Sequence, residues 1–311
     1  MAPMLREQMH THGLRMSKSK IKIGFTDYFN PIDEFFTDVL SQDFDIERDD
    51  ANPDYLFFCD ETFGHNNKNY DVNRVKKILF TGENRRPYTY QCHHAISFDH
   101  FDGPQFFRLP LWVVENWVNN KKLGWEEIWY FNRTMRAKDK EGFASFVVRN
   151  PGCEERNRIF QMLNSYKTVD SGGPLYNNIG GPLEQDGVNS HVVKTEFLKS
   201  RKFHIAYENS SYAGYTTEKI LHGFLGHTIP IYWGSPTVEM DFNPKAFVSR
   251  HNFNTDEDMI RFVQLLDQND ELYDAMMAEP IFTSFQIMKH RNQFFDKFRL
   301  WFRTHVYMGE R

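Results

Sequence analysis

The sequence is poor in cysteine, has little excess of either charge and contains no long apolar run. Its 311 residues include three cysteines, with 37 basic against 42 acidic residues and a formal net charge of -5. An odd number of widely spaced cysteines does not form a disulfide framework and favours reduced thiols in a cytosol. A slightly acidic chain is not expected to bind nucleic acid over an extended surface, although a local basic pocket is compatible with this charge.

Segments for membrane insertion or export are not predicted either. No stretch approaches the roughly 18 uninterrupted apolar residues that a membrane-spanning helix needs. Residues 1–20 carry scattered basic side chains and no apolar core of the kind found in signal peptides. We therefore expect residues 1–20 to be a flexible basic extension of a cytoplasmic protein, with peripheral contact to a membrane surface left open.

The sequence is rich in aromatic residues, arranged in a strand-and-helix alternation. Phenylalanine alone accounts for 30 residues, which predicts a large core. Short apolar runs predict strands of a sheet covered on both faces, at 21–25, 55–58, 78–80, 95–98 and 106–109. Between the first two runs, Asn30 is the predicted cap of a helix, and five residues make its apolar face: Ile32, Phe35, Phe36, Val39 and Leu40.

The second half of the chain alternates in the same way. Strands are predicted at 144–148, 203–207, 228–232 and 246–248, and helices at 153–166, 217–225 and after the capping box that begins at Thr255. This order predicts an α/β protein of two facing doubly wound domains, with ligands at the carboxyl ends of the strands. We expect domains at 21–140 and 141–280, and a C-terminal helix within 281–311 that packs back on the first domain.

The strongest chemical pattern follows the strand at 203–207. The polar residues Glu208 to Ser210 come directly after it, and a loop with Gly214 leads to a helix that starts near Thr217. The free N–H groups of a helix N-terminus favour phosphate, and Lys219 adds a full positive charge there. The alternative interpretation is an ordinary cap followed by a solvated lysine.

Two further residues complete the predicted site. Arg156 lies in the first turns of the helix after strand 144–148, where a cation is unfavourable unless it reaches solvent or an anion. Its guanidinium and Lys219 are predicted to clamp a pyrophosphate, with Arg158 as the rival candidate. Glu83 follows strand 78–80 behind Gly82 and is predicted to be a general base, with a simple turn residue as the alternative.

Patterns typical of metal sites and P-loops are incomplete. The cluster Cys92-His93-His94 has no second ligand pair at zinc spacing, and Asp43-Phe44-Asp45 lies in an acidic segment that reads as a solvated edge. Neither Gly-Gly-Pro run is followed by Lys-Ser or Lys-Thr. No metal ligand is therefore predicted.

Several ordered motifs resemble those of one enzyme family. These are Thr81 to Asn84, Tyr207 to Ser210, Gly214 to Ile220, Ile229 to Pro236 and Asp241 to Val248. Together they are similar to the signature of the α-1,3-fucosyltransferases, glycosyltransferase family 10, and most similar to the bacterial, Helicobacter-type members. The likeness covers about residues 20 to 260 and is far more specific than a single glycine motif.

This resemblance implies a GT-B fold of two facing Rossmann-like domains, with GDP-fucose held mainly by the second. It implies inverting transfer of fucose to N-acetylglucosamine of an N-acetyllactosamine-type acceptor, giving Lewis-type glycans such as those of lipopolysaccharide O-antigen. The family pattern places the base at Glu83. It places the donor site on five residues: Arg156 and Lys219 for the phosphates, Glu218 for the ribose, and Asn209 and Tyr215.

The resemblance implies no obligatory cofactor beyond the donor substrate, although a divalent cation could stimulate product release. It also implies work in the bacterial cytoplasm, at the inner face of the membrane. Two alternatives stay open: a non-catalytic nucleotide- or sugar-binding module, and a transferase for another GDP-sugar. The preference between type 1 and type 2 acceptor chains is not predicted, and four residues either line the acceptor pocket or pack in the core: His93, His94, Trp112 and Trp117.

Overall fold

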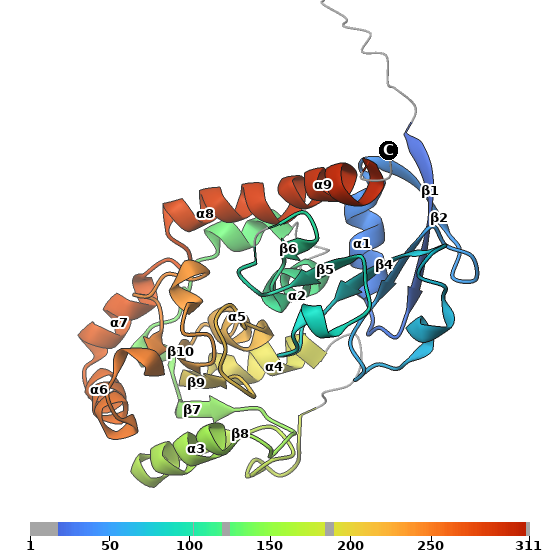
Figure 1. The fold of residues 1–311 in the computed structure, drawn as a ribbon. Helices are drawn as coiled ribbons and strands as arrows, with labels where there is room; N and C mark the ends of the chain where they lie inside the picture. Colours follow the sequence, from blue (N-terminus) through green and yellow to red (C-terminus); the bar gives the residue numbers. More distant parts are fainter. Residues whose placement is uncertain (1–17, 102, 120–124, 184–189, 309–311) are drawn as a thin grey trace, which may run out of the picture.

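Two sheets of parallel strands, each flanked by helices, form the protein (Figure 1). The computed structural model describes residues 18–101, 103–119, 125–183 and 190–308. The first sheet contains β1 (Ser19–Thr26), β2 (Phe44–Arg48), β3 (Tyr55–Phe58), β4 (Lys76–Phe80), β5 (His94–Ser97) and β6 (Phe106–Arg108). The second contains β7 (Gly142–Phe146), β8 (Val169–Ser171), β9 (Arg201–Tyr207), β10 (Ile229–Trp233) and β11 (Val248–Ser249).

Helices alternate with the strands as the sequence predicts. They are α1 (Ile32–Ser41), α2 (Leu111–Asn119), α3 (Glu154–Tyr166), α4 (Ser190–Lys199), α5 (Glu218–Leu225), α6 (Asp256–Gln268), α7 (Asp270–Ala278), α8 (Ser284–Arg291) and α9 (Lys297–Trp301). Of these, α4 and α7 are additional to the predicted helices. Short 3-10 turns, one of them at Trp125–Tyr130, connect several elements. The α/β class expected from the sequence is confirmed.

The strand order of the second sheet contains a reversal of the kind at which open parallel sheets bind ligands. The first sheet has the order β2-β1-β3-β4-β5-β6, and the second the order β11-β10-β9-β7-β8. In the second sheet the direction of winding therefore reverses between β7 and β9. In open parallel sheets a crevice forms at such a reversal, at the carboxyl ends of the strands. The chain beyond β9 begins with Glu208 and Asn209, and α3 follows the end of β7.

The strands that the sequence did not predict are short or polar. β2 and β8 are edge strands of their sheets, and their sequences mix acidic with apolar residues. Asp43 and Asp45 lie at the start of β2, so this acidic segment forms the sheet edge. Strand β1 starts at Ser19, inside the predicted extension, of which residues 1–17 lie outside the described part of the chain.

Helix α1 confirms the predicted apolar face, since Ile32, Phe35, Phe36 and their two partners on that face are all buried. The predicted Asn30 cap is wrong. Pro31 occupies the capping position, and its carbonyl accepts the first helical bond from the Phe35 N–H at 3.1 Å. Because no side chain caps this end, the buried face rather than a cap determines where α1 begins.

The largest group of buried apolar side chains draws residues from both halves of the chain. Trp112 of α2 lies 4.9 Å from Phe242 and 5.8 Å from Phe282 between ring centroids, both in the second half. Trp117 packs edge-on against Phe35 of α1. Both tryptophans are buried, so of the two interpretations left open by the sequence, core packing is correct.

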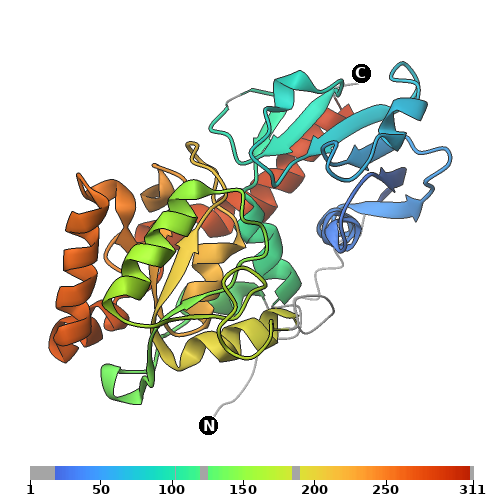
Figure 2. The same ribbon diagram turned by 90° about the horizontal axis from the view of Figure 1, so that it is seen from below.

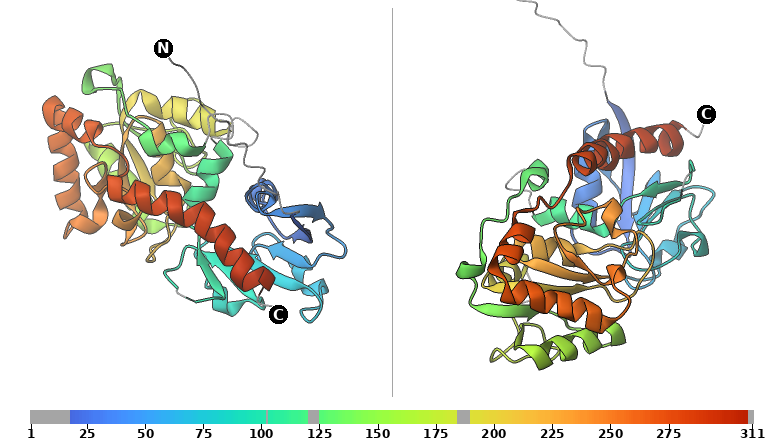
Figure 3. Two further views of the ribbon diagram at one scale, coloured as in Figure 1. Left: turned by 90° about the horizontal axis from the view of Figure 1, so that it is seen from above. Right: turned by 90° about the vertical axis from the view of Figure 1, so that its left-hand side faces the viewer.

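The C-terminal helix crosses from the second half to the first (Figures 2 and 3). Helices α8 and α9 continue through the π-helical turns 292–296 and 302–307. Phe294 packs against Trp112, whereas Phe298 lies 5.7 Å from Phe36 and Phe302 lies 6.3 Å from Phe57 between ring centroids. One helix therefore contributes to the core on both sides of the junction.

Candidate active site

Polar groups from the two halves meet beside β4 and β9. The Glu83 carboxylate follows β4, and its Oε2 atom accepts hydrogen bonds from Asn209 Nδ2 at 3.4 Å and Tyr215 OH at 3.5 Å. Next to it, Asn84 Nδ2 donates to Ser210 Oγ at 2.9 Å. The structure thus brings together three predicted site residues that lie up to 132 positions apart.

The loop that carries Glu83 is held by buried polar groups. The Glu83 N–H donates to Thr81 Oγ1 at 3.3 Å, and Thr81 Oγ1 donates to Asp60 Oδ2 at 3.1 Å. Thr81 and Asp60 are fully buried. A Cβ atom at Gly82 would lie 3.0 Å from the Leu111 side chain, so a larger residue at this position would require that side chain to shift. The Glu83 backbone is therefore fixed against the first sheet.

Glu208 fills the space at the start of α5 that the sequence left for an anion. Its carboxylate is fully buried and accepts from the Thr217 N–H at 2.8 Å and from Thr217 Oγ1 at 2.6 Å. It also lies 3.0 Å from Lys219 Nζ. The sequence analysis placed Glu208 only among the polar residues after the strand. Its position directly after a buried strand was the one available signal for this role.

Lys219 is shared between two carboxylates. Its ammonium lies 3.0 Å from Glu208 and 3.4 Å from Glu218, and it donates to Thr217 Oγ1 at 2.9 Å. Burial lowers the pKa of Lys219, but the two carboxylates outweigh this effect and leave the pKa above its ordinary value. The lysine is thus charged and lies in the predicted place, with protein oxygens already around it.

Arg156 is a buried cation at the start of α3 with unused hydrogen-bonding capacity. Its side chain is 3% exposed, Nη2 donates to the Asn150 carbonyl at 2.7 Å, and Nε has no partner among the described residues. Burial lowers its pKa, and charges on Glu208 and Glu218 partly oppose this. The rival Arg158 is half-exposed and bound to Asp256 at 2.9 Å. Of the two arginines, Arg156 therefore faces the site.

Glu218 lies next to a further group of charges. Burial raises its pKa, but the positive charges of Lys219 and Lys194 outweigh burial and leave the pKa below its ordinary value. Glu218 is therefore ionised at neutral pH. The pKa of Glu115 on α2 shifts the other way: burial, together with the Glu218 charge, raises it to about 7.

Replacing Glu115 by glutamine is expected to stabilise the protein at alkaline pH. Because the folded-state pKa of about 7 exceeds the ordinary glutamate value of 4.5, folding favours protonated Glu115. Its contribution to stability is complete below pH 4.5 and is lost as pH rises to 7. In urea unfolding, Glu115→Gln should exceed the parent by about 1–3 kcal/mol at pH 8 and by much less at pH 5.

The matched control for this prediction is Glu127→Gln, which changes an exposed glutamate beyond α2. Its stability should follow the parent at both pH values. An equal difference between Glu115→Gln and the parent at pH 5 and pH 8 would show that Glu115 does not titrate in this range.

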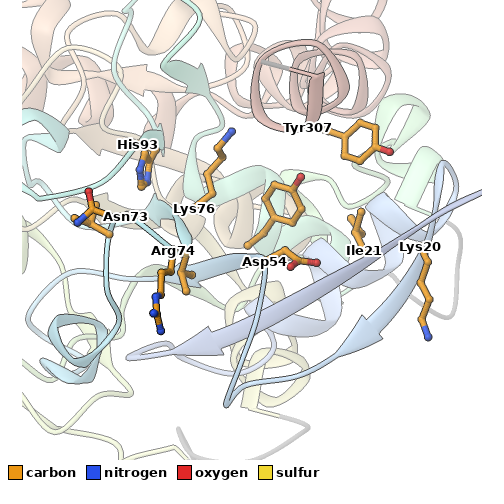
Figure 4. A pocket seen from close by; sticks show the side chains of 11 residues that line it. Lys20, Ile21, Asp54, Asn73, Arg74, Lys76, His93 and Tyr307 are labelled. Carbon is orange, nitrogen blue, oxygen red and sulfur yellow. The ribbon is translucent and has the colours of Figure 1, made fainter. Parts of the chain in front are cut away.

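The pocket drawn in Figure 4 lies away from these residues. It has a volume of about 390 Å³ and is lined by residues that include Lys20, Tyr55 and Lys76, at the amino ends of β1, β3 and β4. Tyr307 of the C-terminal helix closes one side. Since Glu83 follows the carboxyl end of β4, the pocket and the candidate site lie at opposite ends of that strand.

The described residues contain no cluster suited to a metal ion. No group of three or more His, Cys, Asp or Glu side chains among them is arranged to hold one, and this includes Cys92-His93-His94. His94 is buried and packs edge-on against Trp301. No helix in the same ranges is long and apolar enough to cross a membrane.

Two protein-family models match most of the chain. Residues 22–115 match the model "Alpha-(1,3)-fucosyltransferase FucT N-terminal domain". Residues 136–279 match the model "Glycosyltransferase family 10 (fucosyltransferase) C-term". The two matches fall on the first and second sheets, and between them they include all six predicted site residues.

Individual relatives agree with these matches. The chain is 31% identical over 299 residues to alpha-(1,3)-fucosyltransferase FucT of Helicobacter pylori, covering 86% of this chain and 60% of that protein. A putative fucosyltransferase of Acanthamoeba polyphaga mimivirus is 30% identical over 157 residues, covering 49% of this chain and 26% of the relative. The chain thus spans less than two thirds of the length of either relative.

Solved structures extend the likeness to the whole fold. A crystal structure of an alpha1,3-fucosyltransferase with GDP-fucose has a TM-score of 0.74 at 26% identity, covering 96% of this chain and 93% of the other. A second alpha1,3-fucosyltransferase structure has a TM-score of 0.76 at 27% identity, covering 94% and 91%. The GT-B fold expected from the resemblance is confirmed, and the chain belongs to glycosyltransferase family 10, the fucosyltransferase family.

Proposed function

We propose that the protein is an α-1,3-fucosyltransferase. It transfers L-fucose from GDP-fucose to N-acetylglucosamine of lactosamine-type acceptors, with inversion at the anomeric carbon, and makes Lewis-type glycans. The proposal is supported by family membership and by the GDP-fucose in the related structure. The acceptor class and the inverting course rest on the sequence resemblance.

The observation that carries this proposal is the meeting of a carboxylate with the nucleotide-binding half. Glu83 comes from the first sheet, and its contacts Asn209 and Tyr215 come from the loop before α5 of the second. Arg156 and Lys219 lie at the starts of α3 and α5, and their charges act on each other. Displacement from an activated sugar requires a general base for the acceptor hydroxyl and positive charges that bind the leaving diphosphate.

The proposed reaction is a single displacement. The acceptor hydroxyl oxygen attacks the anomeric carbon of fucose while the bond from that carbon to the GDP oxygen breaks. Glu83 takes the hydroxyl proton, and GDP leaves with the bond electrons. Arg156 and Lys219 stabilise the negative charge that grows on the diphosphate. Asn209 and Tyr215 hold the fucosyl side of the donor beside Glu83.

A donor and acceptor panel tests this function. Purified protein is incubated with GDP-fucose and N-acetyllactosamine, and the products are analysed by mass spectrometry. A gain of one deoxyhexose on the acceptor, with linkage to N-acetylglucosamine by NMR, is expected. Transfer from GDP-mannose in place of GDP-fucose would point to another GDP-sugar, and nucleotide binding without any transfer would point to a binding module.

Removing the Arg156 side chain is expected to weaken binding of the diphosphate. In calorimetry, Arg156→Ala should bind GDP at least about tenfold more weakly, because the cation that offers a free guanidinium N–H is lost. Guanosine has no phosphate, so the affinity of Arg156→Ala for guanosine should differ from that of the parent by less than about twofold. Lys219→Ala should also weaken GDP binding, but it leaves the buried Glu208 carboxylate unpaired and will lower stability as well.

Arg158→Ala is the matched control, two residues further along α3. Because Arg158 is bound to Asp256 and half-exposed, this variant should retain GDP affinity. The opposite result, with loss in Arg158→Ala and none in Arg156→Ala, would assign the diphosphate to the rival arginine.

We further propose that the chain divides into a first domain at 21–140, a donor-binding domain at 141–280 and a C-terminal helical segment at 281–311. The two sheets and the contacts of Phe298 and Phe302 with the first half support this division. We place the enzyme in the bacterial cytoplasm, at the inner face of the membrane. The three free cysteines fit a reducing compartment.

A further inference from the structure

Three charged or polar side chains near Glu218 have no part in the proposed reaction: Lys194, Glu115 and His222. Lys194 comes from α4, Glu115 comes from α2, and His222 follows Glu218 by one turn of α5. Both α2 and α4 pack directly against α5. Since residues four apart share one face of a helix, Glu218 and His222 lie along the same side of α5.

The contact between Lys194 and His222 fixes the position of the ammonium group. Lys194 Nζ lies 3.1 Å from His222 Nδ1. An ammonium group only donates, so Nδ1 must accept and the imidazole proton must be on Nε2. His222 is buried, and Nε2 has no partner among the described residues. Burial, aided by the Lys194 charge, lowers the pKa of His222 to about 3, so the ring is a neutral acceptor.

The charged side chains around the start of α5 include a lysine, Lys194, that acts on Glu218 from the neighbouring helix α4. Glu208 and Glu218 share Lys219, at 3.0 Å and 3.4 Å, so one cation serves two carboxylates. Arg156 is a second cation near both carboxylates, and its Nε has no partner among the described residues. Lys194 is the further cation whose charge acts on Glu218. Glu208 and Glu218 are balanced by Lys219 and Arg156, so Lys194 adds a positive charge on the side of Glu218 where α4 packs against α5.

We propose that Lys194, held in place by His222, is a positioning residue that keeps the Glu218 carboxylate oriented to accept hydrogen bonds from the ribose hydroxyls of the nucleotide. This inference rests on the proposed function, in which Glu218 binds the ribose. A carboxylate that receives a ribose diol has to remain ionised and to keep one rotamer. Lys194 acts on this carboxylate through its charge and does not touch the nucleotide.

Calorimetry with two ligands tests the proposal. The probes are GDP and 2′,3′-dideoxy-GDP, which lacks both ribose hydroxyls and keeps the base and diphosphate. Lys194→Met is expected to weaken GDP binding about tenfold and dideoxy-GDP binding less than about twofold. Lys194→Arg keeps the charge and should recover most of the GDP affinity. Lys199→Met, on the same helix and paired with Glu196, is the control and should bind both ligands like the parent.

Each other outcome overturns the proposal in a recognisable way. Equal weakening of both ligands in Lys194→Met would mean a general effect on the fold or the diphosphate, and unchanged GDP affinity would mean no role. Lys194→Gln retains polarity and, with thermal unfolding of all variants, must show the same GDP-specific loss if Lys194→Met folds poorly. A parent protein that binds no GDP would overturn the proposed function, and this inference with it.

Discussion

Glutamine at position 83 is expected to reduce fucose transfer by about 10²- to 10⁴-fold, the usual contribution of a general base. The substitution keeps the size of the side chain and its ability to accept from Asn209 and Tyr215, but the amide cannot take the acceptor proton. GDP affinity should change less than about threefold, because the proposed diphosphate ligands, Arg156 and Lys219, lie on α3 and α5. Turnover of radiolabelled GDP-fucose and calorimetry with GDP measure the two effects.

A control carboxylate separates the chemistry of Glu83 from a loss of charge in the same half. Glu34 is exposed on α1, and Glu34→Gln should retain the parent turnover. If Glu83→Gln retained near-normal turnover, Glu83 would not be the base. If it lost GDP binding to the same extent as turnover, Glu83 would act mainly in holding the nucleotide-binding loop.

Breaking the Arg108–Asp241 pair is expected to destabilise the protein by about 3–5 kcal/mol, the usual cost of leaving one buried charge unpaired. The guanidinium binds both carboxylate oxygens, at 2.7 Å and 3.1 Å, and also donates to the Phe98 carbonyl at 3.2 Å. Burial raises the pKa of Asp241, but Arg108 outweighs burial and keeps the pKa below its ordinary value. Urea unfolding of Arg108→Met and Asp241→Leu measures the loss.

The double variant Arg108→Met/Asp241→Leu is the control for this pair. It removes both charges together, so it should be more stable than either single variant. Single variants that each lose less than about 1 kcal/mol would show that the pair is solvated in solution. Since β6 carries Arg108 and the second half carries Asp241, the single variants should also lower transfer through a shift of Glu83 relative to Asn209.

Local patterning was enough to predict most of the secondary structure. The run Tyr55 to Phe58 is apolar on both faces, and it forms a buried strand with the predicted bounds. The five apolar positions of α1 repeat with the helical period, and all five are buried. Edge strands such as β2 alternate weakly and border solvent, so their sequence carries little signal. The Asn30 cap failed because a buried face, rather than a cap, fixes the start of α1.

The two arginines of α3 show where sequence reasoning stopped. Residues two apart on a helix point in widely different directions, so only one of Arg156 and Arg158 can face a given site. The sequence contains no means of choosing between them. In the folded protein, Asp256 of α6 binds Arg158, and Arg156 turns into the interior beside Asn150. The partner of a charge is set by elements about one hundred residues away.

The sequence by itself determined the alternation of strands and helices, the polar residues at strand ends and the family resemblance, because each depends on neighbours within one element or motif. Only the tertiary structure decided how the charges pair. It placed Glu208 under the start of α5, divided Lys219 between two carboxylates, and left a free donor on Arg156. Coulombic partners and burial depend on distances between elements, and the fold alone sets those distances.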